Sequence, residues 1–183
     1  MFRRAILAAL ISALVVGCGP SSPSASSPPA PVVGKARDAQ FELVITASQN
    51  RYRVNQPVQV ATRLTYVGPK KQIKITHSGG GAVIVSLEQL DGPFDPGGGS
   101  DASCGGSVLE AGMPVDAAYQ KSGGWSGEDP MADRYKAFFA DPLVRLEPGA
   151  YRFTAHADFY EGGCGEGGAQ HDIVASVTVE VVP

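Results

Sequence analysis

Hydrophobic and polar residues alternate with a period of two through most of the chain beyond residue 40. Such alternation is typical of β-strands that bury one face and expose the other. The runs with inward-facing apolar positions are Phe41 to Ile45, Val58 to Tyr66, Ile73 to Ile75, Val83 to Leu87, Tyr151 to Phe159 and Ile173 to Val181. Turn-forming pairs such as Pro148-Gly149 separate them. This pattern predicts an all-β fold, a two-sheet antiparallel sandwich of about seven to nine strands over 39–183.

One segment departs from the strand period. Apolar residues recur at four-residue spacing from Met131 to Phe139, between the dipeptides Asp129-Pro130 and Asp141-Pro142. The first dipeptide can provide a helix cap and a first turn, and the second can end a helix. The sequence therefore predicts a short inserted helix at about 130–140, with its aromatic side chains against the sandwich. An aromatic ligand site is the alternative.

The first 18 residues have the features of an export signal. Arg3 and Arg4 precede an uncharged, mostly apolar run over 5–16, which is shorter than the ~20 residues a membrane-spanning helix needs. The run ends in Val15-Val16-Gly17-Cys18, which resembles the lipobox of bacterial lipoproteins. The resemblance implies a signal peptide over 1–17 and a lipid on the thiol of Cys18. A plain secretory signal and a twin-arginine signal are the alternatives.

A segment rich in serine and proline follows. Ten of the 13 residues in 19–31 are Ser or Pro, and no charged residue lies between Arg4 and Lys35. Such a composition predicts an extended tether, here over 18–38. Together with the lipobox it implies a domain held outside the cytoplasm by the lipid bilayer. The expected location is the outer leaflet of the cell membrane, or the outer membrane if the cell is Gram-negative.

The cysteine count agrees with this interpretation. If Cys18 carries a lipid, Cys104 and Cys164 remain as a pair. Both lie in glycine-rich segments, and an exported pair is free to oxidise. A disulfide is therefore predicted. A two-thiol redox or metal site is the alternative, but the CxxC spacing it favours is absent.

The segment from Leu146 to Phe153 contains Pro-Gly-x-Tyr, which resembles the tyrosine corner of immunoglobulin-like and fibronectin-like sandwiches. In that class, the tyrosine hydroxyl bonds back over the preceding loop, and the corresponding residue here is Tyr151. The strand spacing also makes the domain loosely similar to Ig-like domains of bacterial surface lipoproteins and to the intracellular proteinase inhibitor family. The resemblance implies an Ig-like sandwich and transfers no inhibitory residue.

Candidate metal ligands are sparse. His156 and Asp158 share one strand face, and His171-Asp172 begins the next predicted strand. If the two strands form a hairpin, these residues could converge on zinc. Ordinary outward-facing polar residues are the alternative. Three aspartates within 91–101 lack the spacing of an EF-hand, so at most weak calcium binding is expected there.

The sequence gives little support for a nucleotide site, a serine hydrolase or nucleic-acid binding. The glycines in 163–168 spell GxGxxG, but they lie between two predicted strands and indicate a hairpin loop. No GxSxG elbow occurs, and the chain has 3 His. A formal charge of −3 gives no reason to expect nucleic-acid binding. We therefore expect no catalytic residue, no cofactor and no nucleic-acid partner.

Charge and the single tryptophan leave two further questions open. Residues 35–74 hold eight bases and two acids, whereas 75–183 hold five bases and 16 acids. The basic part could face anionic headgroups, or its side chains could simply protect strand edges. The bases in question are Arg51, Arg53, Lys70, Lys71 and Lys74.

Trp125 lies in a glycine-rich loop, either as an exposed contact residue or as a plug against the sandwich.

The expected function is therefore that of a non-enzymatic binding or structural module in the bacterial envelope. Its partner would be an unidentified envelope protein or ligand. A proteinase-inhibitor-like domain acting through one projecting loop is one alternative. A metal- or calcium-dependent binding module is the other.

Overall fold

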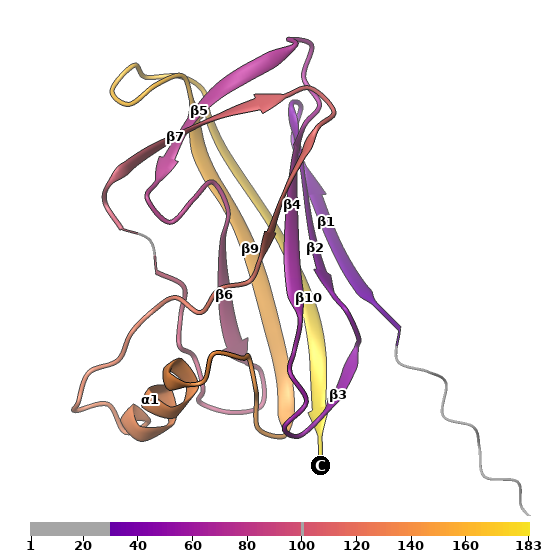
Figure 1. Ribbon diagram of the computed structural model, residues 1–183, viewed down its shortest axis with the longest axis vertical. Coiled ribbons are helices and arrows are strands. Elements are labelled where there is room, and N and C mark those ends of the chain that lie inside the picture. The colour runs from indigo at the N-terminus through magenta and orange to yellow at the C-terminus, as the bar shows by residue number, and fades with distance from the viewer. Residues whose placement is uncertain (1–29, 100) are drawn as a thin grey trace, which may run out of the picture.

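The computed structural model describes residues 30–99 and 101–183, which form two β-sheets packed face to face (Figure 1). The four-stranded sheet contains, in spatial order, β1 (Val32–Arg37), β2 (Phe41–Ala47), β4 (Val60–Tyr66) and β8 (Pro114–Ala118). The six-stranded sheet contains β3 (Arg51–Arg53), β10 (Gln170–Val182), β9 (Gly149–Glu161), β5 (Gln72–Ser78) and β7 (Cys104–Glu110), while β6 (Ile84–Gln89) also pairs with β9. The all-β two-sheet sandwich predicted from the sequence is confirmed.

Three details of that prediction need correction. Within the described residues there are ten strands, and the pairing of β3 with β10 is parallel. The sandwich also begins before residue 39, because β1 pairs with β2 along its whole length inside the segment expected as tether. An edge strand buries few side chains, and those of β1 are only half-buried or exposed, so its sequence shows little hydrophobic pattern. The expected signal peptide and Cys18 lie outside the described residues.

Strands β9 and β10 form the longest pair of the molecule and organise its core. Side chains along both strands alternate between buried and exposed positions from end to end, as the sequence predicted. Tyr151, Phe153 and Phe159 are among the largest fully buried side chains. The 161–170 turn lies at one end of this pair, which we call the hairpin end. The loop spelling GxGxxG is this turn, as expected.

The single helix of the described chain, α1 (Ala132–Ala140), lies at the opposite end, which we call the helix end (Figure 1). Asp129 Oδ1 accepts a hydrogen bond of 2.8 Å from the backbone N–H of Met131, just before the first turn. Tyr135 and Phe138 are buried against Phe94, each with ring centroids 5.3 Å from it. The predicted helix and its packing against the sandwich are therefore confirmed.

The corner before β9 has the predicted hydrogen bond. The hydroxyl of Tyr151 donates to the backbone carbonyl of Glu147 at 3.0 Å, and Arg134 donates to the same hydroxyl at 3.2 Å. This links α1 to the start of β9 and fixes the approach of the chain to the sheet. Among the described elements, no helix has both the length and the apolar character required to cross a membrane.

Candidate functional site

A polar groove of about 480 Å³ lies on the outer face of the six-stranded sheet. Its floor comes from three strands, because β9 pairs with β5 at the hairpin end and with β6 from His156 toward the helix end. Tyr160 is 46% exposed there and presents its aromatic ring on the outward strand face. The principal lining side chains are Thr76 and His77 from β5, Ser86 from β6, and His156, Asp158 and Tyr160 from β9.

The register of β9 and β10 determines which side chains lie beside the groove residues His156 and Asp158. Asp158 lies directly opposite Asp172 across this ladder, so two carboxylates occupy paired positions. His156 Nε2 lies 2.6 Å from Asp172 Oδ1, and the side-chain amide of Gln170 donates to Asp158 at 3.0 Å. Each carboxylate is therefore engaged by a different neighbour, and both remain exposed to solvent.

One wall of the groove is held by the predicted disulfide. Cys104 and Cys164 are bonded, with an S–S distance of 1.97 Å and a sequence separation of 60. Beside it, Asp101 accepts hydrogen bonds of 3.0 Å from the backbone N–H groups of Gly79 and Ser103. The hydroxyl and backbone N–H of Ser103 lower the pKa of Asp101, so this exposed carboxylate stays ionised. The disulfide thus joins the groove wall to the β9–β10 turn.

Trp125 both packs on the fold and remains accessible. Its ring stacks on Phe139 of α1 with centroids 5.4 Å apart and an interplanar angle of 13°, yet the residue is 42% exposed. The same loop contacts the wall of the groove, since Ser122 Oγ accepts a 3.2 Å hydrogen bond from the backbone N–H of Gly99. Trp125 is therefore packed on the fold, as the plug interpretation expects, and partly exposed, as the contact interpretation expects.

The candidate metal ligands His156, Asp158 and His171 do not converge. His156 and Asp158 do line the groove together, but His171 is 8% exposed and faces the core. Its register partner on β9 is the buried Phe159, and it is Asp172 that reaches the outer face. Successive residues of a strand point to opposite faces, so His171 lies on the buried face of the β9–β10 pair, whereas His156 and Asp158 lie on the exposed face. Among the described residues no group of three His, Cys, Asp or Glu is placed to hold a metal.

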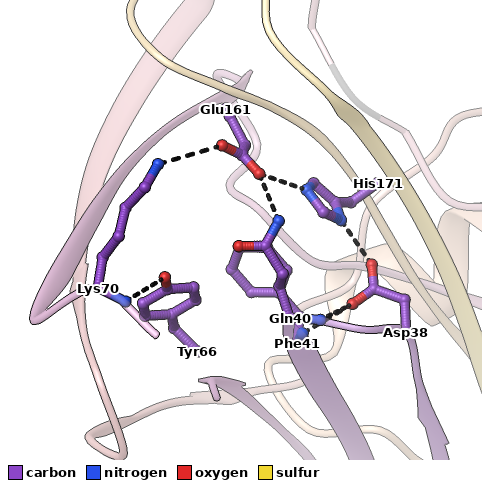
Figure 2. Close-up of polar contacts among 7 residues, drawn as sticks. All are labelled: Asp38, Gln40, Phe41, Tyr66, Lys70, Glu161 and His171. Carbon is purple, nitrogen blue, oxygen red and sulfur yellow. Dashed lines mark hydrogen bonds and ion pairs between the residues drawn. The ribbon is translucent and has the colours of Figure 1, made fainter. Parts of the chain in front are cut away.

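His171 instead is the buried member of a partly buried polar cluster at the hairpin end (Figure 2). Its Nδ1 lies 2.5 Å from Asp38 Oδ2, and its Nε2 lies 3.3 Å from Glu161 Oε1. The imidazole packs against Phe41 and Phe159, with ring centroids 4.6 and 5.3 Å away. The ends of β9 and β10 and the distant β1–β2 turn thus meet at one imidazole ring.

Asp38 is the best-connected member of this cluster. Its Oδ1 accepts hydrogen bonds of 2.7 Å from the backbone N–H groups of both Gln40 and Phe41. Partial burial disfavours the charged carboxylate, but the hydrogen bonds from His171 and from the two backbone groups outweigh that effect. The pKa of Asp38 is consequently lowered below 3.8.

The basic segment 35–74 does not form one surface. Arg51 on β3 pairs with Glu180 at 3.3 Å at the helix end. Lys70 pairs with Glu161 at 3.8 Å at the hairpin end, and Lys74 also pairs with an acid there. The bases considered for contact with headgroups therefore lie at opposite ends of the sandwich, mostly beside carboxylates. These bases therefore do not form one contiguous basic patch.

Sequence reasoning missed two parts of this picture. His77 and Tyr160 were not recognised as groove residues, although Tyr160 could have been placed beside His156 and Asp158 by the period of two. Asp38 and His171 are separated by 133 residues, and no local pattern connects them.

Comparisons with known proteins add little. No protein-family model matches the chain, and no curated protein matches it. Among solved structures, a β-glucosidase from Listeria innocua, determined in complex with glucose, is similar with a TM-score of 0.38 and 14% identity. The match covers 78% of this chain and 16% of that chain. A likeness this weak carries no argument about function.

Proposed function

We propose that this chain is a lipid-anchored binding module of the bacterial envelope that engages its ligand in the polar groove on the six-stranded sheet. The observation that supports it most is the groove itself. Its volume of about 480 Å³ falls within the ~300–1,000 Å³ typical of small-molecule and cofactor sites. Most of its hydrogen-bonding side chains come from strands, which hold them in fixed positions.

The ionisable side chains that line the groove indicate which class of ligand it can bind. Its ionisable lining residues are Asp101, Asp158, His77 and His156, and no lysine or arginine is among the described residues that line it. Tyr160 adds an aromatic face to which a sugar ring, a planar group or a cation can bind. These features favour a polar ligand that is neutral or positively charged over an anion.

The strand order supports the Ig-like assignment. In Ig-like sandwiches, strands A, B and E share one sheet and strands C, F and G share the other. Here β2, β4 and β8 are neighbours in one sheet, and β5, β9 and β10 are neighbours in the other. Domains of this architecture commonly serve as binding modules, although the fold does not specify the ligand.

The membrane anchor is tested by Cys18→Ser in the full-length protein. The lipobox predicts that wild-type protein sediments with membranes and that the variant is released from them. Retention of the variant in the membrane fraction would contradict the anchor.

The groove is tested by capture from envelope extract with the full-length chain as bait. We expect a partner that is retained by wild-type protein and by Val115→Ala, and lost by His156→Ala combined with Tyr160→Ala. Val115 is a matched control, because it is 50% exposed on β8 of the other sheet. A parallel Trp125→Ala bait shows whether the neighbouring loop contributes. A partner retained equally by the groove variant would exclude the groove as its site, and a captured protease would favour the inhibitor alternative.

A further inference from the structure

We propose that His171 is a proton-controlled latch at the hairpin end of the sandwich. With a proton on both ring nitrogens it ties Glu161 to Asp38. Loss of the Nε2 proton releases Glu161 and loosens the disulfide-bearing turn beside the groove. The latch itself stands on the geometry of the cluster alone, whereas its role in regulating binding rests on the proposed function of the groove.

The two contacts of the His171 ring require two hydrogen-bond donors. Carboxylates accept hydrogen bonds and donate none, and a neutral imidazole has a single N–H. His171 presents one ring nitrogen to Asp38 and the other to Glu161, at 2.5 and 3.3 Å. Only the doubly protonated ring can donate to both carboxylates at once. The arrangement therefore corresponds to the charged form of His171.

The surroundings give the ring no other ionic partner in the described structure. Asp38 comes from the β1–β2 turn and Glu161 from the end of β9, while Phe41 and Phe159 cover the ring with apolar surface. The one nearby base is Lys70 of the β4–β5 loop, whose Nζ lies 3.8 Å from Glu161 Oε2 (Figure 2). Two carboxylates thus face one imidazolium and one ammonium.

The hydrogen bonds of His171 to Asp38 and to Glu161 differ in strength. The contact with Asp38 is shorter by 0.8 Å, the difference between 3.3 and 2.5 Å, so the neutral ring keeps its proton on Nδ1. Nε2 then presents a lone pair to the Glu161 carboxylate, which is repulsive, and its proton has passed to solvent. Glu161 retains the side-chain amide of Gln40 at 2.6 Å, together with Lys70, and can move toward them.

Movement of Glu161 reaches the groove through short covalent and hydrogen-bonded links. The next residue, Gly162, donates its N–H to the carbonyl of Lys74 at 2.8 Å and accepts a 2.7 Å bond from the hydroxyl of Thr76. Thr76 lines the groove. Two residues further, Cys164 is bonded to Cys104 in the groove wall. Release of the latch therefore loosens the floor and the wall together.

Hydrogen exchange tests the latch in the full-length protein in detergent, without any ligand. Histidine ordinarily changes charge between pH 5 and 8, so exchange is compared at these two values after correction for the intrinsic rate. We expect the protection of peptides that span 161–170 to fall about tenfold from pH 5 to pH 8, while protection of β2 and β4 stays constant. Constant protection at 161–170 would overturn the latch.

Two variants separate the latch from a general effect of pH. Glu161→Gln supplies an amide that can accept from the charged ring and donate to the neutral one, so the dependence on pH should disappear. His156→Gln removes the exposed histidine on the opposite face and should leave the dependence as in wild type. A wild-type profile in Glu161→Gln, or a flat profile in His156→Gln, would contradict the proposal.

A second measurement does not depend on how the variants fold. Nitrogen NMR of wild-type protein distinguishes protonated from unprotonated ring nitrogens. We expect two protonated nitrogens on His171 at pH 5 and one at pH 8. A single protonated nitrogen at pH 5 would overturn the latch and leave the groove as a binding site untouched. An empty groove would leave the latch intact.

Discussion

Asp158 and Asp172 lie directly opposite one another on the outer face of the β9–β10 ladder. Like charges in opposed positions destabilise a sheet. Here the two carboxylates are separated by their partners, since His156 contacts Asp172 and Gln170 contacts Asp158. A local arrangement that opposes stability is more often found at a functional site than elsewhere. The pair therefore supports the assignment of this face as a binding surface.

Replacing Asp158 by asparagine should stabilise the protein slightly and impair capture of its partner. Asparagine keeps an oxygen that can accept from Gln170 while removing one of the two facing charges. We expect a gain of about 0.5 kcal/mol in the free energy of unfolding, because the site is exposed and screened by salt. Urea unfolding at low and high salt measures it. A loss of stability in both conditions would contradict this account of the pair.

The disulfide should make a large contribution to stability. Bonding residues 60 apart restricts the unfolded chain, and the chain-entropy model gives an upper figure of about 4 kcal/mol. We expect Cys104→Ser combined with Cys164→Ser to unfold at a markedly lower denaturant concentration. Reduced wild-type protein should match the double variant. Equal midpoints for oxidised and reduced protein would show that the bond only joins two loops.

Tyr119 illustrates a buried polar group with an energetic cost. Its ring packs edge-on against Phe153 at 5.3 Å, and its hydroxyl is buried without a hydrogen-bond partner among the described residues. Burial raises the pKa of Tyr119 to about 12. We expect Tyr119→Phe to gain about 1 kcal/mol in stability and to remove the latest phase of a spectrophotometric tyrosine titration. Destabilisation by this substitution would reveal a partner for the hydroxyl.

Asp38 should govern the loss of stability in acid. Its pKa in the folded protein is lowered below 3.8, so the ionised form stabilises the fold above that pH. The contribution is lost as the pH falls through the folded pKa. We expect Asp38→Asn to be less stable than wild type at pH 6 and to lose less stability between pH 5 and pH 2. Parallel stability curves for the two proteins over this acid range would contradict the assignment.

The sequence predicted the parts of the fold that depend on local pattern. The long strands β9 and β10 alternate without interruption, so their buried faces could be assigned residue by residue. The corner at Tyr151, the helix α1 and the disulfide also follow from short segments or from the cysteine count. In each case the physical cause lies within a few residues, or, for the disulfide, in the two cysteines that remain once Cys18 is set aside.

The parts that failed depend on contacts between distant segments. Strand β3 has three residues and pairs with β10 only, so its pattern is too short to recognise. The alternation of β10 does place His171 on the buried face with Ile173, but it does not say which groups the ring contacts there. Its partner Asp38 belongs to a turn at the other end of the sequence.

The most direct test of the groove as a binding surface is site-specific photo-cross-linking in living cells. A photoreactive phenylalanine replaces Tyr160 in the full-length protein, or Val115 on the other sheet as the control. After irradiation, the intact mass of the purified protein reports any adduct. We predict a discrete adduct from position 160 that is absent from position 115. No adduct from position 160, or the same adduct from both positions, would contradict the assignment of the groove.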